Sequence, residues 1–440
     1  MKGWDWRFRL ARLGYNLAIH LLIPLVLLHF LWRSRREPGY RRHLGERFAL
    51  GARVSRKPDL WIHAVSLGEM RVAGTVVRAL TERHPQMQIL LTTGTPAGRA
   101  EAERIRETGL PVSIRYLPLD APGLVRRFIH RNRPATLVLV ETELWPNLLW
   151  QTHRAGLTTV LVNGRLSPRL RATYRRFNRL YTPLLAVLKC VGAQDPADAD
   201  HFRKLGASRV TVTGNLKFDL PEQPPAAVLT RGRFAGDRLW LAGSTHPGEE
   251  SRLLDIHCRI RAAHSGLQVQ LLLAPRHPAR AQEAKALGLE RSLSVVLRSE
   301  LDTAAIVADV VVLDTLGELP GLYGIADAAF VGGSLVARGG QNPLEAIVAG
   351  CPVVMGPDSR NFASMIERLR EADAIVLAAD ADAVCEALTE LLRNPPARLA
   401  QAEKARQVLG ANRGATARTL TLLEPLISDR DPDPARHRQG

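Results

Sequence analysis

Several patterns that identify common nucleotide-binding and metal-binding proteins are missing from this sequence. It has no GxxxxGK[S/T] phosphate loop, and Gly332-Gly333-Ser334 does not complete the GxGxxG pattern of dinucleotide enzymes. No aspartate pair of the DxD kind follows a candidate strand, and His and Cys form no cluster with metal-ligand spacing. The sequence therefore disfavours a dinucleotide enzyme and indicates neither a metal site nor a cofactor.

Cysteine and aromatic residues are scarce. The four cysteines, Cys190, Cys258, Cys351 and Cys385, lie far apart, so we expect reduced core residues rather than disulfides. Aromatic residues make up 5% of the chain, and no RNP, zinc-finger or basic-zipper pattern appears. We therefore expect no nucleic-acid partner.

Apolar residues and positive charge are plentiful. The 440 residues are 46% hydrophobic, which is enough for two or three domains with large cores. Lys and Arg outnumber Asp and Glu by 60 to 43, giving a formal charge of +17. This balance favours anionic partners such as acidic lipid or phosphorylated substrates.

The segment at residues 13–32 is an apolar run of about the length that crosses a bilayer. Basic residues flank it on both sides, and the denser group follows it, which favours a cytoplasmic location for the rest of the chain. The run lacks a following small-residue cleavage site, so we do not expect a cleaved signal peptide. A buried core helix and a helix lying in the membrane interface are the alternatives to a spanning helix.

Short apolar runs then alternate with helix-length segments, as in parallel sheets covered by helices on both faces. We expect an anchor and juxtamembrane segment at residues 1–50, Rossmann-like domains at 51–222 and 223–427, and a flexible tail at 428–440. A proline-rich break (DLPEQPP, 219–225) separates the domains. The predicted strands are residues 60–65, 88–93, 112–117, 136–141, 158–163 and 210–214, then 239–243, 269–275, 294–297, 310–314, 328–332, 353–355 and 374–377.

A glycine-rich turn at residues 339–346 (GGQNPLEA) is the most informative motif. Apolar runs on both sides predict the order strand, turn, helix, strand. Asn342 is suited to cap the helix, and Glu345 stands three residues later, the spacing of a capping box. A helix N-terminus above a parallel sheet is also where phosphate binds, and Glu345 offers an acceptor to ribose hydroxyls. A nucleotide site and a structural cap both fit this turn.

Charged residues follow several predicted strands. Glu69 would begin the helix after the first strand, where it could serve as a general base or, alternatively, only favour the helix dipole. Glu141 and Glu143 directly follow the strand that begins at residue 136. Arg276 follows the strand at 269–275, where it could meet a nucleotide phosphate. An arginine run after the strand at 158–163 could bind phosphates or form a solvated helix face; it includes Arg165, Arg169 and Arg171.

Eight blocks of this sequence, in order, resemble those of 3-deoxy-D-manno-octulosonic acid (Kdo) transferases. The resemblance runs from PGY at residues 38–40 and GER at 45–47 to about residue 425. The blocks are residues 63–69, 141–147, 163–167, 214–219, 243–250, 274–278, 316–323 and 339–345.

This resemblance implies an α/β fold of the glycosyltransferase-B type, with two doubly wound Rossmann-like domains and an N-terminal membrane-anchor helix. It also implies transfer of Kdo from CMP-Kdo to lipid IVA, the tetraacyl disaccharide bisphosphate precursor of lipid A, with inversion and without a required metal. The implied location is the inner membrane, with the catalytic domains on the cytoplasmic side.

The resemblance also implies roles for individual residues. Glu69 would be the general base that deprotonates the acceptor hydroxyl, and Glu143 would assist in the acceptor or sugar pocket. We expect Arg165, Arg169 and Arg171 to bind the acceptor. Gln341 stands where the family commonly has His. The implied donor-binding residues are Lys217, Arg276, His277, Gly317, Glu318, Leu319, Asn342 and Glu345.

Three other functions remain to be distinguished. A glycosyltransferase of the same fold could use a UDP-sugar. Measuring turnover of CMP-Kdo against turnover of UDP-sugars distinguishes that enzyme from a Kdo transferase. A nucleotide-sugar epimerase-like enzyme would not need the N-terminal apolar helix. A non-catalytic membrane scaffold would need neither Glu69 nor the turn at residues 339–345.

Overall fold

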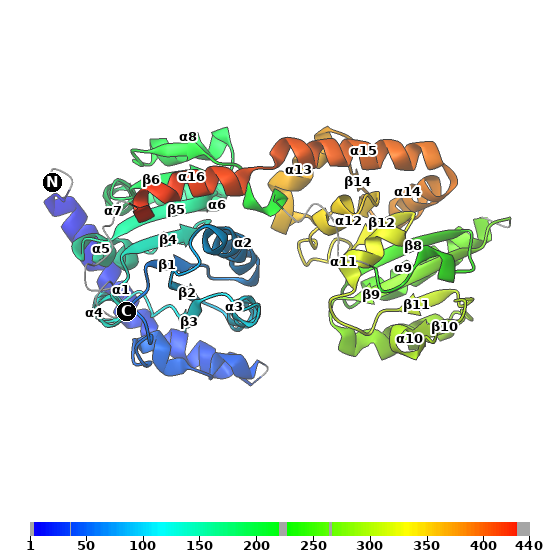
Figure 1. Ribbon diagram of the computed structural model, residues 1–440, viewed down its shortest axis with the longest axis horizontal. Coiled ribbons are helices and arrows are strands. Elements are labelled where there is room, and N and C mark those ends of the chain that lie inside the picture. Colours follow the sequence, from blue (N-terminus) through cyan, green and yellow to red (C-terminus); the bar gives the residue numbers. More distant parts are fainter. Residues whose placement is uncertain (1–3, 36, 220–226, 264–265, 429–440) are drawn as a thin grey trace. The chain divides into compact units, whose positions relative to one another are not determined.

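The computed structural model describes residues 4–35, 37–219, 227–263 and 266–428, and Figure 1 shows its elements. The chain divides into unit 1, which is Met1–Asp219 with Arg413–Gly440, and unit 2, which is Leu220–Asn412. Apart from Asp219 and Ser428, the proline-rich break and the predicted tail lie outside the described residues.

Unit 1 is built on a seven-stranded, all-parallel sheet in the order β3-β2-β1-β4-β5-β6-β7. Its central strands are runs of Leu, Ile and Val buried on both faces, as parallel strands between helical layers must be. The strands are β1 (Leu60–His63), β2 (Ile89–Thr93), β3 (Val112–Tyr116), β4 (Thr136–Val140), β5 (Thr158–Gly164), β6 (Cys190–Ala193) and β7 (Val210–Val212).

The helices of unit 1 mostly begin at capping residues or prolines that the sequence supplies. Ser66, Thr95, Ser167 and Asp195 each accept a backbone N–H of the first helical turn. The helices are α1 (Trp6–Arg33), α2 (Leu67–Arg83), α3 (Pro96–Glu107), α4 (Pro122–Asn132), α5 (Pro146–Arg154), α6 (Pro168–Arg176), α7 (Asn178–Leu185), α8 (Pro196–Lys204) and α16 (Ala415–Ser428).

Unit 2 repeats this plan with the order β10-β11-β9-β8-β12-β13-β14, again all parallel. Its strands are β8 (Arg238–Thr245), β9 (Val269–Pro275), β10 (Val295–Leu297), β11 (Val310–Val312), β12 (Ala328–Val331), β13 (Val353–Met355) and β14 (Val376–Leu377). Its helices are α9 (Glu249–Ala263), α10 (Ala281–Leu289), α11 (Leu319–Leu322), α12 (Leu344–Val348), α13 (Ala363–Glu371), α14 (Ala381–Arg393) and α15 (Pro395–Asn412).

Two doubly wound parallel sheets of this kind confirm the predicted fold class. Every predicted strand is present, with ends that differ by up to two residues. The sequence missed only β6, because its four residues, CVGA, include a glycine and are too short to stand out as an apolar run.

The last helix, α16, packs on unit 1 although the chain reaches it through unit 2. Leu420 and Leu423 of α16 lie in the same apolar cluster as Val76 of α2. The Asp219 carboxylate accepts the backbone N–H groups of Gly414 and Thr416, which fixes the start of the helix. Residues 413–428, which we expected in the second domain, therefore group with the first.

Helix α1 leaves most of its apolar surface uncovered. Its N-terminal end packs on unit 1, with Trp4 against Trp150 at a ring-centroid distance of 4.6 Å. The leucines along the remainder are 60–67% exposed: Leu10, Leu13, Leu17, Leu21, Leu25 and Leu28. The helix is long and apolar enough to cross a membrane, and none of its most apolar window is buried. This exposure excludes the buried core helix that the sequence left as an alternative.

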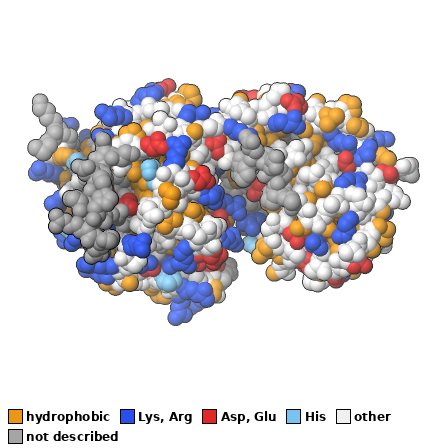
Figure 2. Space-filling model, in the orientation of Figure 1, with side chains coloured by type: hydrophobic (Ala, Val, Ile, Leu, Met, Phe, Trp, Pro, Cys, Tyr) orange, Lys and Arg blue, Asp and Glu red, His pale blue; other side chains and the backbone are white. Residues whose placement is uncertain are grey.

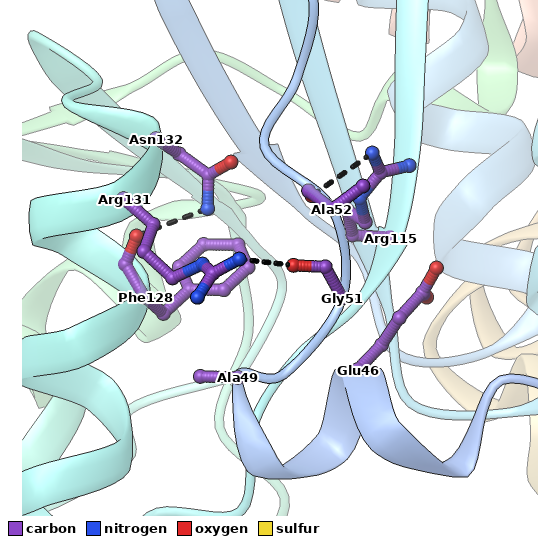
Figure 3. Close-up of a pocket in the computed structure, with 8 residues that line it drawn as sticks. All are labelled: Glu46, Ala49, Gly51, Ala52, Arg115, Phe128, Arg131 and Asn132. Carbon is purple, nitrogen blue, oxygen red and sulfur yellow. Dashed lines mark hydrogen bonds between the residues drawn. The ribbon is translucent and has the colours of Figure 1, made fainter.

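Residues 46–51, after α1, are held against the sheet of unit 1 by polar contacts, of which Figure 3 shows the one between Arg131 and Gly51. The Glu46 carboxylate pairs with Arg99 at 2.7 Å and accepts the Tyr116 N–H at 2.8 Å. Arg131 donates to the Gly51 carbonyl at 2.8 Å. Phe128 and Asn132 line the same small hollow, which is closed by these contacts. The GER block of the sequence therefore joins the apolar helix to the sheet.

Candidate active site

The topological switch point of unit 1 lies between β1 and β4, where the strand order reverses. Ligands of open parallel sheets bind at such points, beyond the carboxyl ends of the strands. Glu69 follows β1, and Glu141 and Glu143 follow β4, so the fold brings the predicted carboxylates of unit 1 to one place.

Glu69 occupies the third position of α2 and forms a complete capping box with Ser66. One carboxylate oxygen accepts the backbone N–H of Val65 at 2.6 Å and that of Ser66 at 3.1 Å. Burial raises the pKa of Glu69, nearby Glu141 raises it further, and the two backbone donors and Lys217 oppose the shift. Glu69 can therefore stabilise the start of α2 and also act as a base, because the capping box fixes a carboxylate whose pKa is raised.

Glu141 is buried beside Glu69 and pairs with Lys217, with 2.7 Å between Oε1 and Nζ. The Asn163 side chain, at the end of β5, donates to the same carboxylate oxygen at 3.5 Å and accepts the Leu216 N–H at 2.9 Å. Glu141 and Asn163 both have positive φ, 64° and 53°. Such backbone costs roughly 1–3 kcal/mol per residue and is typical of functional sites.

Glu143 completes the cluster from the loop after β4. Burial, and then the negative charge of Glu69, raise its pKa to about 8, against a hydrogen bond from Trp145 Nε1 at 2.6 Å. At neutral pH the Glu143 carboxyl is therefore mostly protonated and can donate a hydrogen bond. The cluster thus contains a protonated carboxyl, two further carboxyl groups and one ammonium group.

Glu69 and Glu143 are predicted site residues and the family resemblance adds Lys217, whereas Glu141 is noted only for its place after a strand and Asn163 is not selected. The signal was present, because both are polar residues placed directly after buried strands. The sequence could not predict that Glu141 pairs with Lys217, since these residues are 76 positions apart in the chain.

The switch point of unit 2 lies between β8 and β12, and backbone donors and cations surround it. The buried Glu249 carboxylate accepts the N–H groups of His246 (2.9 Å), Gly333 (2.7 Å), Ser334 (3.1 Å) and Leu335 (2.9 Å). This single side chain therefore fixes the loops after both strands. Burial raises its pKa in spite of these donors.

His246 lies at the centre of a basic cluster. Its pKa is lowered by burial and then by the positive charges of Arg338, His277, Arg276 and Arg280. Gln341 contacts His246 through its amide nitrogen, at 3.0 Å from the ring Nε2. The predicted Arg276 and His277 therefore lie near His246, which was not among the predicted site residues, and Gln341, to which no role was assigned, contacts the same histidine. A cluster of this charge suits a phosphate.

The glycine-rich turn differs from the predicted geometry in one respect. Helix α12 spans only Leu344–Val348, its N-terminal flanking residue is Pro343, and that position makes no side-chain cap. Asn342 instead accepts the Leu344 N–H at 3.1 Å, two residues ahead, in a local turn. The expectation that Asn342 and Glu345 form a capping box was wrong, because Pro343, expected in the first turn, precedes the helix and puts Glu345 in its second position.

Gly339 and Gly340 both have positive φ, and a side chain on either would collide with Asn361, or with Met355 and the backbone of Asp358. The Asp358 carboxylate accepts the Gly339 N–H at 2.8 Å. Arg360 lowers the pKa of Asp358 to about 2. The turn is therefore held by its own contacts, independently of any ligand.

The remaining predicted donor residues form a separate loop after β11. Gly317 is exposed with a φ of 84°, and Leu319 begins α11. Glu318 pairs with Arg298 at 2.9 Å, so its carboxylate has a protein partner. Within the described part of the chain, no group of three or more His, Cys, Asp or Glu residues could hold a metal ion.

The predicted arginines after β5 do not share one environment. Arg169 is exposed, and Arg165 lies near Asp198. Arg171 donates to His201 Nε2 at 2.7 Å and lines a groove with Arg175 and Lys204. Arg165 and Arg171 therefore both lie near Asp198, but of the three predicted arginines only Arg171 lines the groove.

Comparison with known proteins places these sites in a family. Residues 42–220 match the family described as 3-deoxy-D-manno-octulosonic-acid transferase (kdotransferase). The chain is 34% identical over 432 residues to the 3-deoxy-D-manno-octulosonic acid transferase of Haemophilus influenzae, covering 96% of this chain and 99% of that protein. It is 37% identical to the Bordetella pertussis protein of the same name, covering 93% and 98% of the two chains.

Solved structures show the same two-domain fold at low identity. A UDP-N-acetylglucosamine 2-epimerase aligns with a TM-score of 0.58 and 14% identity, covering 86% of this chain and 98% of that one. MurG of Acinetobacter baumannii aligns with a TM-score of 0.52 and 15% identity, covering 84% of this chain and 100% of that one. Because epimerases and MurG share the architecture, the fold leaves the chemistry to be argued from the site.

Proposed function

Since this chain belongs to the Kdo transferase family, we propose that it transfers Kdo from CMP-Kdo to lipid IVA in lipopolysaccharide assembly. The observation that carries the proposal is the carboxylate cluster at the switch point of unit 1. There, Glu69 is fixed by two backbone donors and has a raised pKa beside the Glu141–Lys217 pair.

Transfer requires a base for the acceptor hydroxyl. In the proposed reaction, a primary hydroxyl oxygen of the acceptor bonds to the anomeric carbon of Kdo, and the bond from that carbon to the CMP phosphate breaks. The hydroxyl proton passes to Glu69, whose raised pKa makes it a stronger base than a free carboxylate. A single displacement of this kind inverts the anomeric configuration.

The neighbours of Glu69 have complementary roles in this proposal. Glu143, protonated near neutral pH, donates a hydrogen bond to the bound sugar. The Lys217 ammonium, held by Glu141, contacts the carboxylate of the donor sugar. Glu141 is in our interpretation a positioning residue, because its carboxylate is already engaged by Lys217.

The basic cluster of unit 2 supplies the donor site. We assign the CMP phosphate to Arg276 and His277 beside His246, where cations compensate the charge that develops on the departing phosphate. This compensation does not require a divalent ion, so we expect turnover in the presence of a chelator. The nucleoside is assigned to Gly317, Glu318, Leu319, Asn342 and Glu345.

Helix α1 fits the location that this substrate demands. Its exposed leucines and basic flanks suit insertion into an acidic leaflet, where a tetraacylated acceptor resides. We propose that α1 attaches the enzyme to the inner membrane, with both units on the cytoplasmic side.

Product analysis tests the proposed reaction. The purified chain is incubated with CMP-Kdo and lipid IVA, and the products are resolved by mass spectrometry; a parallel incubation supplies UDP-sugars instead. Addition of Kdo mass to the acceptor, abolished in the Glu69→Ala variant, supports the proposal. Turnover of a UDP-sugar without turnover of CMP-Kdo would identify a different glycosyltransferase, and full activity of Glu69→Ala would remove the assigned base.

A further inference from the structure

Helices α6 and α8 of unit 1 enclose a groove of about 580 Å³ that has no role in the mechanism above. Arg171 and Arg175, one turn apart on α6, line one side. His201 and Lys204, three residues apart on α8, line the other. Pro168, Ala172 and Leu205 make up the rest of the lining, so the groove itself contains no carboxylate.

Carboxylates lie near this groove, Asp198 near Arg171 and both Asp195 and Asp200 near His201. In the part of the chain that the structure describes, Arg171, Arg175 and Lys204 form no ion pair. The acidic residues of α8 face other partners: Asp195 caps the helix, Asp198 accepts the Leu166 N–H at 2.9 Å, and Asp200 pairs with Arg203 at 2.7 Å. Lys and Arg are spread over the visible face of both units in Figure 2, so positive charge alone does not mark a site. What distinguishes this groove is that four basic side chains line one hollow and that its three Lys and Arg residues are in no ion pair within the described residues.

His201 fixes the geometry of the groove. Arginine can only donate, so the 2.7 Å contact with Arg171 requires His201 Nε2 to accept. This contact holds the Arg171 guanidinium on the groove wall, with its other N–H groups available. Burial, and then Arg171 and Lys204, lower the pKa of His201, which keeps Nε2 available as an acceptor at neutral pH.

The groove is connected to the carboxylate cluster through α6. Tyr174, on the same helix, is buried and donates to the Thr142 carbonyl at 3.4 Å, beside Glu143. One side of α6 thus faces the loop of Glu143, and another faces the groove. The same helix therefore borders both places, so an acceptor that extends around α6 can contact both.

We propose that the groove of Arg171, Arg175, His201 and Lys204 binds a phosphate group, and that this phosphate belongs to the lipid acceptor. The second part rests on the proposed function. A guanidinium pair with an ammonium opposite matches a terminal phosphate monoester, which offers three oxygens. With a phosphate held here, a hydroxyl at the other end of the acceptor is directed toward Glu69.

The test compares the full-length protein in detergent with the double variant Arg171→Ala/Arg175→Ala. Arg176→Ala is the matched control, because Arg176 is exposed on the same helix and does not line the groove. We measure steady-state transfer to lipid IVA and to analogues that lack one or the other phosphate, and equilibrium binding of each acceptor without donor. The double variant should raise the KM and Kd for lipid IVA about tenfold, with the KM for CMP-Kdo unchanged.

The analogues identify the ligand. Removing the phosphate that occupies the groove should weaken wild-type binding to the same extent, and the variant should no longer distinguish that analogue from lipid IVA. If the double variant weakened binding of every acceptor equally, or weakened binding of no acceptor, the inference would be overturned. A variant with Lys at both positions should recover most of the affinity, which a misfolded groove would not allow.

Two further outcomes separate this inference from the proposed function. If the wild-type chain binds lipid IVA through its phosphate but transfers no Kdo, the proposed function fails and the groove is retained. If Kdo transfer proceeds and the variant binds lipid IVA normally, the groove assignment fails alone. Loss of binding to phosphatidylglycerol vesicles, with normal lipid IVA affinity in detergent, would assign the groove to a membrane phospholipid and overturn the acceptor assignment.

Discussion

The switch points of the two units occupy equivalent positions in similar sheets and have opposite electrostatic character. In unit 1, the strand ends present Glu69, Glu141 and Glu143 with one lysine. In unit 2, they present His246 among four cationic or basic side chains, with two buried carboxylates: Glu249 accepts backbone N–H groups, and Glu250 pairs with Arg280. The shared architecture determines where polar residues gather, and the residues after each strand decide the charge of that place, which is the basis of the roles proposed for the two units.

The largest expected effect is at Glu69. Glu69→Gln keeps a hydrogen-bond acceptor for the backbone N–H groups of Val65 and Ser66 but removes the base. We expect kcat to fall by roughly 10²–10⁴-fold, with little change in the KM for CMP-Kdo. Glu82→Gln, exposed on the same helix, is the control. A fall of less than tenfold would mean that unit 1 does not supply the base.

At the other switch point, Arg276→Ala should act on donor affinity. Removing a guanidinium from a phosphate should raise the KM for CMP-Kdo by roughly 10–100-fold and leave the KM for lipid IVA unchanged. Arg370→Ala serves as the control, because Arg370 is exposed on α13 and pairs with Glu367. An equal rise in both KM values would contradict the division of roles between the units.

Glu143 gives a stability prediction with a defined sign. Its pKa is about 8 in the folded protein against an ordinary value of 4.5, so ionising it costs the folded state stability as pH rises from about 4.5 to 8. Glu143→Gln, neutral at every pH, should match the wild type near pH 4 and be more stable at pH 8. Thermal unfolding midpoints across this range measure the difference. A constant difference would show that Glu143 does not titrate in this window.

The smallest expected effect is at Gln341. Gln341→Ala removes one hydrogen bond to His246 and should raise the KM for CMP-Kdo about fivefold, corresponding to ~1 kcal/mol. Gln341→Glu tests the charge of the cluster, since a carboxylate there should repel the donor phosphate and raise the KM further. A lower KM for the Glu variant would contradict phosphate binding beside His246.

Much of the fold could be predicted from the sequence, because the strands of parallel sheets are recognisable as apolar runs. Buried strands such as β4 (TLVLV) and β9 (VQLLLAP) are nearly continuous apolar runs, and polar residues directly after them mark one edge of a sheet. The prediction that Glu69 begins a helix is confirmed, and Ser66 and Glu69 also form a capping box that the sequence analysis did not name. The predicted capping box of Asn342 and Glu345 was wrong, because Pro343 precedes the helix instead of lying in its first turn.

What the sequence by itself determined is where polar residues follow the strands, because strand ends, turn glycines and helix starts are local features that extend over a few residues. Only the tertiary structure decided the partners, because these come from distant parts of the chain. Lys217 meets Glu141, Gln341 meets His246, and Arg171 meets His201. It also brought α16 back to unit 1, since Leu420 and Leu423 are buried against α2 there. Charge pairing and burial set the pKa values and leave some cations unpaired, and both arise only from contacts that exist once the chain is folded.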